Sequence, residues 1–407
     1  MPLVTNKRIK EGNRRHVLGL LRNSAPVDVS QVADAVGLSR MTVHKVIEHY
    51  VDMGLVKPAG KGDAVGELGK KPNLFRLNSE YRLVFGAQIF RTSFLAAITD
   101  LNANILRHLH VEFAENTHIA SILDRIRGAF DTLAADLKAN HGRFLGMVLG
   151  TNGVTDAEEG VILMATHFDS WGEFVPVREM LRERFPTFPV LHIDNGIRHQ
   201  AYAEMKIGAA RGLRNFLVIG TEYDGTSAGL VLDGVLTRGK RGLSGEIGHM
   251  QVDISSRETC ACGGRGCLEA MTSLMRMEDK ARGLRDAFPD STLFAGRPPE
   301  ELSYRDIFAA SAEGDILARR LLDESATYFA SAVSNIVQVC DPELVIIQGA
   351  YTEAGDWFLQ RLREKARRVS LLRMDKNIQI TYSRFGEVQG VVGGAHYAAD
   401  RFFAGMK

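Results

Sequence analysis

Three of the four cysteines of this chain, Cys260, Cys262 and Cys267, lie within eight residues, and His249 precedes them by eleven residues. Three thiolates and one imidazole make a tetrahedral Cys3His set, which zinc prefers and which leaves no open coordination position. A closed site of this kind is structural, so we expect zinc to hold the glycine-rich loop between these ligands. A redox thiol cluster or a chance grouping of unrelated residues is the alternative.

The composition is that of an ordinary globular protein, with 45% hydrophobic and 24% charged residues in 407 positions. This length predicts two or three domains. No run of about 18 apolar residues occurs, so we expect no membrane insertion. The first 15 residues lack the apolar core of a signal peptide. The few, clustered cysteines exclude a disulfide framework and favour a reducing cytoplasm.

The net charge of +1 conceals an asymmetry along the chain. Residues 1–78 contain 13 Lys and Arg against 7 Asp and Glu, whereas the remainder contains 37 against 42. A basic N-terminal segment on an acidic body indicates contact with a polyanion, although a solvated surface can carry the same bias.

Apolar residues at helical spacing predict three helices in the first 54 residues. Ser30 and Ser39 are the expected N-caps of the second and third helices, and Gly37 supplies the tight turn between them. The apolar positions hold these two helices together, which leaves the outward positions of the third helix free to enter a major groove. The resulting candidates for DNA contact are Ser39, Arg40, Thr42, His44 and Lys45.

Two short strands are predicted beyond the third helix, at Leu55–Lys57 and Asn73–Leu77, with a tip between them that is rich in glycine and lysine. Lys61, Lys70 and Lys71 of this tip would contact phosphate or the minor groove. Helical pattern, turn glycine, basic tip and charge bias together predict a winged helix-turn-helix. A helical interaction domain with a flexible hairpin is the alternative.

From Tyr81 onward, patterns typical of strands alternate with patterns typical of helices, which predicts an α/β body with ligand loops at strand ends. We expect a winged helix at 1–80, a first α/β lobe at 81–197 and a second lobe at 198–407. The second lobe would contain the cysteine-rich loop, at 244–270, and a C-terminal helix that returns to the first lobe.

The sequence EIGH at 246–249, followed by CACGGRGCLE at 260–269, resembles the signature of the ROK family of repressors, open reading frames and sugar kinases. The segment 150–162 is similar to that family's sugar loop, 342–350 to a strand of its nucleotide lobe, and 69–78 to the wing of its repressors. The resemblance covers nearly the whole chain. It implies a two-lobed, actin-like or sugar-kinase-like (ribonuclease H-like) ATPase fold.

In that family, residues equivalent to Glu246, His249 and Glu269 contact the hydroxyls of a bound sugar. Two carboxylates in one pocket suit a polyol, although either glutamate alone could be a surface charge or a helix cap. The histidine could serve both functions if one ring nitrogen binds zinc and the other faces the sugar. The sugar-binding residues that the resemblance implies are Asn152, Gly153, Asn195, Glu246, His249 and Glu269.

The chain departs from the family's kinases where phosphoryl transfer needs specific side chains. The aspartate that acts as general base in the kinases is replaced by Gly196. The nearby Asp194 cannot take its place, because its side chain would point in a different direction. In the first phosphate loop, Gln88 replaces the acid, and Phe90 and Arg91 replace glycines that let backbone N–H groups approach phosphate.

Two further loops differ as well. Asp224, in the second glycine-rich loop, would repel a triphosphate, and the adenine-side pair of glycines is weakened to QGA at 348–350. Because phosphoryl transfer depends on positioning and on charge stabilisation of the phosphates, we predict that this body is not an enzyme.

The leading hypothesis is a transcription regulator, most simply a repressor, that binds double-stranded operator DNA as a homodimer or homotetramer. Its body would respond to a sugar or sugar phosphate of carbohydrate metabolism, with zinc as a structural cofactor. The alternatives are an ATP-dependent sugar kinase with a fused DNA-binding domain, and a repressor whose body binds a protein partner instead of a sugar.

Overall fold

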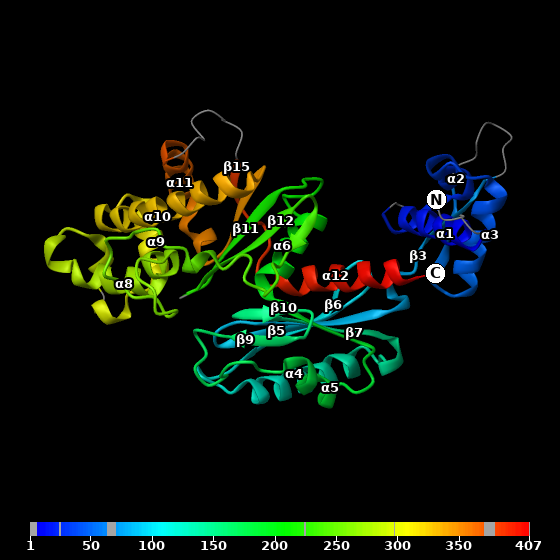
Figure 1. Ribbon diagram of the computed structural model, residues 1–407, viewed down its shortest axis with the longest axis horizontal. Helices are drawn as coiled ribbons and strands as arrows, with labels where there is room; N and C mark the ends of the chain where they lie inside the picture. The colour runs from blue at the N-terminus through cyan, green and yellow to red at the C-terminus, as the bar shows by residue number, and fades with distance from the viewer. Residues whose placement is uncertain are drawn as a thin grey trace.

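The computed structural model describes residues 6–23, 26–62, 71–223, 225–296, 298–369 and 379–406. These residues form an N-terminal domain and two α/β lobes, arranged along an elongated molecule with the N-terminal domain at one end (Figure 1). No helix in these ranges is long and apolar enough to cross a membrane.

The N-terminal domain combines three helices with a small antiparallel sheet of strand order β1-β3-β2. The first wing strand is longer than predicted, so Lys61 ends strand β2 instead of lying in the tip, and Lys70 is outside the described residues. The elements are α1 (Asn6–Asn23), β1 (Val27–Asp28), α2 (Val29–Val36), α3 (Arg40–Asp52), β2 (Val56–Lys61) and β3 (Asn73–Leu77).

The prediction that Ser30 caps the second helix is wrong, because Asp28 takes that position. The Asp28 carboxylate accepts hydrogen bonds from the backbone N–H groups of Ser30 and Gln31, at 2.6 and 3.0 Å. The Gln31 side chain accepts one from the Asp28 N–H, which completes a capping box. A carboxylate at this end also complements the helix dipole. The cap of α3 is Ser39, as predicted.

The core of the N-terminal domain continues into the body. Val17 and Leu21 of α1 pack with Ile47 of α3, and the same cluster contains Leu101 and Ala399, which belong to the body. Because these side chains share one dry core, the winged helix cannot reorient freely without exposing apolar surface.

The first lobe is built on a five-stranded sheet of order β10-β7-β4-β5-β6, in which β4, β7 and β10 are parallel. Helices α4 and α5 cover one face of this sheet, and α12 covers the other (Figure 1). The elements are β4 (Leu83–Ile89), β5 (Ser93–Thr99), β6 (Ile105–Glu112), α4 (Ile119–Asp136), β7 (Phe144–Thr151), β8 (Val154–Asp156), β9 (Val161–Met164), α5 (Val177–Arg184) and β10 (Val190–Asn195).

The second lobe contains another five-stranded sheet, of order β13-β12-β11-β14-β15. Helix α6 packs on one face of this sheet, and α10 and α11 pack on the other. The elements are α6 (Gly196–Ile207), β11 (Phe216–Thr221), β12 (Thr226–Leu232), β13 (Val235–Thr237), α7 (Leu268–Thr272), α8 (Leu274–Gly283), α9 (Tyr304–Glu313), α10 (Ile316–Cys340), β14 (Leu344–Gly349), α11 (Gly355–Val369) and β15 (Gln379–Tyr382).

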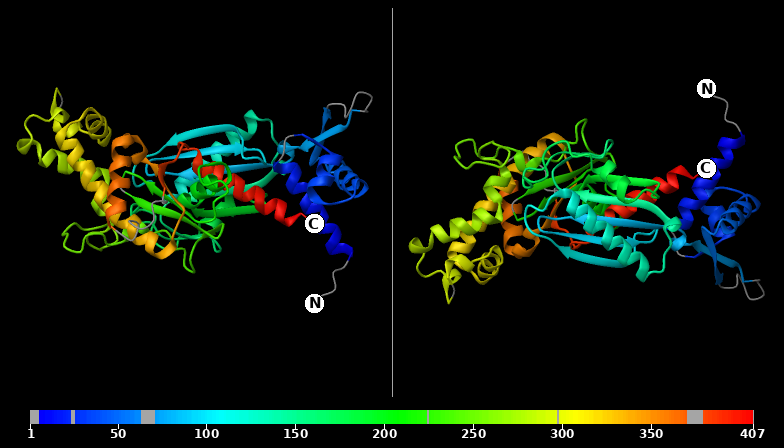
Figure 2. Two further views of the ribbon diagram at one scale, coloured as in Figure 1. Left: turned by 90° about the horizontal axis from the view of Figure 1, so that it is seen from above. Right: turned by 90° about the horizontal axis from the view of Figure 1, so that it is seen from below.

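The C-terminal helix α12 (Gln389–Gly405) lies beside α6 between the two sheets and runs on to the N-terminal domain (Figure 2). The close approach of the two helices requires glycine, because a Cβ at Gly393 would lie 1.7 Å from the carbonyl oxygen of His199. The predicted boundary after residue 80 falls between β3 and β4. The predicted boundary after residue 197 falls inside α6.

Candidate ligand pocket and metal site

A pocket between the two lobes brings together all six residues that the sequence resemblance assigned to a sugar. It encloses about 660 Å³ of empty space, solvent at its mouth included. The first lobe contributes Arg91, Asn152, Gly153, Ala165, Thr166, His167, Phe168 and Asn195 to its lining, and the second contributes Glu222, Gly225, Thr226, Ser227, Glu246, His249 and Glu269.

Asn195 fixes the first-lobe side of the pocket. As the N-cap of α6, its Oδ1 accepts a hydrogen bond from the Ile197 N–H at 3.1 Å, and its Nδ2 donates to the Gly153 carbonyl at 2.9 Å. Gly153 has φ +83°, and a Cβ there would lie 2.3 Å from the Met164 carbonyl oxygen. The loop after β7 is therefore held tightly between α6 and β9.

Glu269, at the start of α7, is engaged from both lobes. Its Oε2 accepts a hydrogen bond from the Thr226 N–H at 3.2 Å, and its Oε1 lies 3.2 Å from Nε2 of His167. Burial, the largest single influence, would raise the pKa of Glu269, but His167, His249 and the Thr226 N–H together lower it, which keeps the carboxylate charged. His167 was missed from the sequence, because a single histidine in a loop carries no motif.

The carboxylate of Glu246 has no hydrogen-bond donor or ion-pair partner among the described residues. Burial, only partly offset by Arg198 and reinforced by Glu269, raises the pKa of Glu246 to about 7. A half-buried acceptor that no described residue satisfies is suited to receive a hydrogen bond from a ligand.

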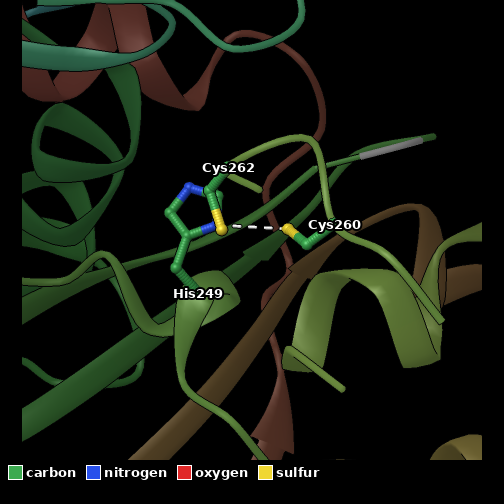
Figure 3. A group of neighbouring side chains, drawn as sticks. All are labelled: His249, Cys260 and Cys262. Atoms are coloured by element: carbon green, nitrogen blue, oxygen red, sulfur yellow. Dashed lines mark hydrogen bonds between the residues drawn. The ribbon is translucent and has the colours of Figure 1, made fainter. Parts of the chain in front are cut away.

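Three of the four predicted metal ligands, His249, Cys260 and Cys262, have their ligand atoms within 4.8 Å of one another, whereas Cys267 lies outside this compact group. The imidazole of His249 faces the thiols of Cys260 and Cys262 (Figure 3). Nδ1 of His249 lies 3.5 Å from Sγ of Cys260, and the Sγ atoms of Cys262 and Cys267 lie 3.9 Å apart. Tetrahedral zinc, with bonds of about 2.3 Å to sulfur and 2.0–2.1 Å to nitrogen, separates its ligand atoms by roughly 3.5–3.8 Å. The donor types and the separation of His249 from Cys260 therefore fit zinc.

A second group, His192, Asp194 and His199, is equally compact. However, Asp194 Oδ1 accepts a hydrogen bond from Nη1 of Arg198 at 2.8 Å, and Oδ2 accepts one from Nε of Arg238 at 2.7 Å. We call Asp194, Arg198 and Arg238 the arginine clamp. Two adjacent guanidinium groups oppose the binding of a dication, so this group is not suited to a metal. The clamp also makes Asp194 unavailable as a general base.

Gly196, at the position that the resemblance assigns to the family's general base, lies against Gln88, the second residue that departs from the kinase pattern. A Cβ at Gly196 would lie 2.0 Å from Nε2 of Gln88, whose side chain is 3% exposed and also abuts Gly150 and Gly390. No carboxylate can be added at position 196 unless Gln88 moves. The two departures from the kinase pattern therefore lie directly against each other.

Arg91, assigned from the sequence to a lost phosphate loop, lines the pocket and forms an ion pair with Glu115. The pairing reduces the positive charge that it offers to a ligand. Asp224, the residue expected to repel a triphosphate, lies outside the described residues.

The candidates for DNA contact lie on one side of α3 and on the wing. Ser39, Arg40, His44, Lys45, Lys61 and Lys71 are exposed, and Thr42 is half-buried. The hydroxyls of Ser39 and Thr42 are hydrogen-bonded to each other at 2.9 Å, and His44 lies 3.2 Å from Glu48. Arg40 and Lys45 form no ion pair with another described residue, so they are the better placed to meet phosphate or base edges.

A winged helix joined to two α/β lobes that enclose a polar pocket defines a class of protein with a sugar-kinase-like body and an added N-terminal domain. Residues 84–401 match the model of the ROK family, and the chain belongs to this family.

A xylose repressor of Caldicellulosiruptor bescii is 25% identical over 389 residues, which are 95% of this chain and 94% of that protein. A glucokinase of Halalkalibacterium halodurans is 29% identical over 279 residues, or 68% of this chain and 81% of that protein. The crystal structure of a ROK family transcriptional regulator, a homolog of the E. coli MLC protein, superposes with a TM-score of 0.81 at 22% identity and covers 98% of both chains. The predicted fold class is confirmed.

Proposed function

We propose that the protein is a transcriptional repressor of sugar metabolism genes that binds operator DNA and responds to a sugar or sugar phosphate. The observation that supports this most is the convergence of five polar residues and Gly153, predicted from separate segments, on one pocket of a chain that carries a winged helix. The relatives matched over nearly the whole length of the chain include a protein named as a xylose repressor.

The pocket offers acceptors to the hydroxyl groups of a sugar. Glu246 has a free carboxylate, and His249 turns Nδ1 toward Cys260, which leaves Nε2 for the ligand. Asn152 and Asn195 supply amides from the opposite lobe. Polar groups that converge from both lobes favour a polyol whose binding links the two lobes.

We further propose that the body does not transfer phosphate. A general base is absent at Gly196, Gln88 fills the adjoining space, and the arginine clamp occupies both oxygens of Asp194. Glucokinases of the same family match the chain, so a sugar kinase activity is the competing function. A coupled assay with ATP and a panel of hexoses decides between the two: turnover at 1 s⁻¹ or faster, an ordinary enzymatic rate of that order, would contradict our proposal.

Zinc is the proposed structural cofactor, held by His249, Cys260, Cys262 and Cys267. Bound there, the ion would cross-link a loop that begins beside Glu246 and ends two residues before Glu269. The loop needs such support, because its backbone is tightly turned: a Cβ at Gly266 would lie 1.9 Å from the Asp253 carbonyl oxygen. The metal would thus keep two sugar acceptors in register without entering any reaction.

A junction of three helices supports communication between the pocket and the winged helix. The carboxylate of Asp400, on α12, pairs with Arg22 of α1 and accepts a hydrogen bond from Tyr202 of α6. Lys206 of α6 lies 2.6 Å from the same carboxylate. Because Asn195 caps the other end of α6, movement at the pocket would reach α1 and change operator affinity by a coupling free energy of about 1–3 kcal/mol.

A two-fold symmetric oligomer, a homodimer or a homotetramer, would read an operator with inverted half-sites a whole number of helical turns apart. Arg40, Thr42, His44 and Lys45 would face the major groove with Ser39 at its edge, while Lys61, Lys70 and Lys71 of the wing would follow the backbone.

The test is fluorescence anisotropy on duplex DNA from the protein's own promoter region, titrated with D-xylose, D-glucose, N-acetyl-D-glucosamine and their 6- or 5-phosphates. We expect at least one to change operator affinity about 5- to 150-fold. Glu246→Gln should abolish that response without changing operator affinity, and Glu183→Gln, an exposed carboxylate on α5, should leave both unchanged. Failure to bind the promoter, or a response that survives Glu246→Gln, would contradict the proposal.

A further inference from the structure

Arg198 is the largest fully buried side chain in the described part of the chain, with 1% of its surface exposed. It lies in the first turn of α6, three residues after Asn195, and it does not line the pocket. Burying a guanidinium is costly, and Nε of Arg198 has no hydrogen-bond partner among the described residues, so its place here calls for a specific explanation.

The guanidinium of Arg198 joins segments that are distant in the sequence. Nη1 donates to the Asp194 carboxylate at 2.8 Å and to the Thr155 carbonyl at 3.3 Å. Nη2 donates to the Ser244 carbonyl at 3.3 Å and also to the Gly242 carbonyl. One planar group thus holds the end of β10, strand β8 and the loop that follows β13.

Each of these three segments contains a partner of Arg198 that is close in sequence to a pocket residue. Asp194 directly precedes Asn195, Thr155 follows Gly153 by two residues, and Ser244 precedes Glu246 by two residues. Strands β8 and β10 belong to the first lobe, and the loop after β13 belongs to the second. All three pocket segments are therefore bound by a single side chain.

The packing around these contacts is tight. Gly242 has φ +72°, and a Cβ there would lie 2.4 Å from the Thr155 carbonyl oxygen, so the second-lobe loop rests directly on β8. Arg238, from the same loop, donates from Nε to Asp194 at 2.7 Å. Asp194 itself has no exposed surface. The loop is thus attached to the first lobe by two guanidinium groups and by direct backbone contact.

We propose that Arg198 is a positioning residue for the effector: it fixes the position of Glu246 relative to Gly153 and Asn195, across the pocket, without touching the ligand. The inference takes its ligand from the proposed function, whereas the contacts of Arg198 are independent of that function. Lysine cannot replace it, because one ammonium on a flexible stem cannot span a carboxylate and carbonyls on two sides as the planar fork does.

Hydrogen exchange on the ligand-free protein tests the contacts. In Arg198→Lys, amides of residues 152–156 and 242–246 should exchange at least tenfold faster than in the wild type, while α4 and α10 keep their rates. The matched control is Arg184→Lys. Arg184 also binds one carboxylate, that of Asp124, and two carbonyls, those of Met180 and Ala120, but none of these residues lines the pocket. Unchanged exchange in both segments of Arg198→Lys would overturn the proposal.

Isothermal titration with D-xylose, D-glucose and N-acetyl-D-glucosamine tests the consequence. Whichever sugar binds the wild type should bind Arg198→Lys at least tenfold more weakly. Zinc content and sugar-free operator affinity, which a general loss of structure would lower, should stay at wild-type values. Wild-type sugar affinity in this variant would overturn the proposal.

The two proposals fail separately. If none of the three sugars, nor any phosphate ester of them, binds the wild type, the proposed function is wrong, while hydrogen exchange still decides the role of Arg198. If Arg198→Lys does not fold, the double variant D194N/R198Q serves instead. It removes both charges of the buried pair together, and the same two results are expected of it.

Discussion

The cysteine-rich loop and the arginine clamp each bring potential metal ligands together, but in opposite electrostatic surroundings. His249, Cys260 and Cys262 have their ligand atoms within 4.8 Å of one another, and so do His192, Asp194 and His199. No described lysine or arginine pairs with the thiols, whereas two guanidinium groups occupy the carboxylate of the second group. We therefore propose that the surrounding charge, and not proximity alone, decides which of the two groups can bind a metal.

The two regions also position the pocket by different means. The cysteine-rich loop would hold His249 and Glu269 in place through a bound ion. The arginine clamp uses hydrogen bonds to hold the strand end at Asn195 and the loop that leads to Glu246. A metal cross-link tolerates an irregular, glycine-rich backbone. A buried guanidinium requires every neighbouring carbonyl to be in place. The clamp should therefore be the more sensitive of the two to small displacements.

The largest expected effect is loss of the metal. Cys262→Ser should release zinc and lower the melting temperature by about 10 °C or more, because the loop then loses its cross-link. Emission spectroscopy measures zinc content, and calorimetry measures the melting temperature. Cys340→Ser, on α10 outside the cluster, is the control and should retain one zinc per chain. A wild-type protein purified without any zinc would contradict the assignment.

The cysteine-rich loop could be predicted from the sequence and the arginine clamp could not. Three cysteines in eight residues are rare in a chain with only one other. Asp194, Arg198 and Arg238 are common residue types spread over 45 positions, and only the fold brings them together. For the same reason His167 could not be predicted, since its contact with Glu269 joins residues that are 102 positions apart in the sequence.

Short-range sequence signals correctly predicted the turn between the second and third helices, but they misplaced the N-cap of the second helix. Gly37 and Ser39 follow short-range rules, and both have the predicted roles. Asp28 displaced Ser30 because the helix starts earlier than its apolar stripe. Gly196 could be recognised as a missing base, but its contact with Gln88, 108 positions earlier, depends on how the strands are ordered in the sheet.

The second expected effect concerns the carboxylate of the clamp. Asp194→Asn should lower the free energy of unfolding by about 3–5 kcal/mol, because Arg198 is left buried without a counter-charge. Urea unfolding measures the loss. Zinc content should not change, since this carboxylate holds no metal. If the substitution removed a second metal ion per chain, the electrostatic distinction between the two regions would be wrong.

A smaller effect should follow from pH. Burial lowers the pKa of His199 to about 4 and that of His192 to about 3, below the value of about 6.5 in the unfolded chain. The unfolded state then binds more protons between pH 6.5 and pH 4, so stability falls as pH falls through this window. His199→Asn should reduce the loss between pH 7 and pH 5 by about 2 kcal/mol at most. Equal losses in the two zinc-saturated proteins would refute it.

Arg238→Gln should have the smallest effect on stability, but it tests most directly whether charge separates the two groups of potential metal ligands. Arg238 keeps 26% of its side chain exposed, so its removal should cost only about 1 kcal/mol. The substitution frees Oδ2 of Asp194, which lies 3.9 Å from Nε2 of His192, and removes one of the two opposing charges.

If charge alone keeps this second group free of metal, Arg238→Gln should bind one additional Zn²⁺ or Ni²⁺ at micromolar concentrations, and the wild type should not. Calorimetric titration of zinc-saturated protein measures the added site, and Arg214→Gln, an exposed arginine paired with Asp233, is the control. Binding by the wild type would mean that two guanidinium groups do not exclude a dication here. No binding by Arg238→Gln would mean that Arg198 alone is sufficient to exclude the metal. A single side chain would then both exclude metal from this group and set the geometry of the pocket.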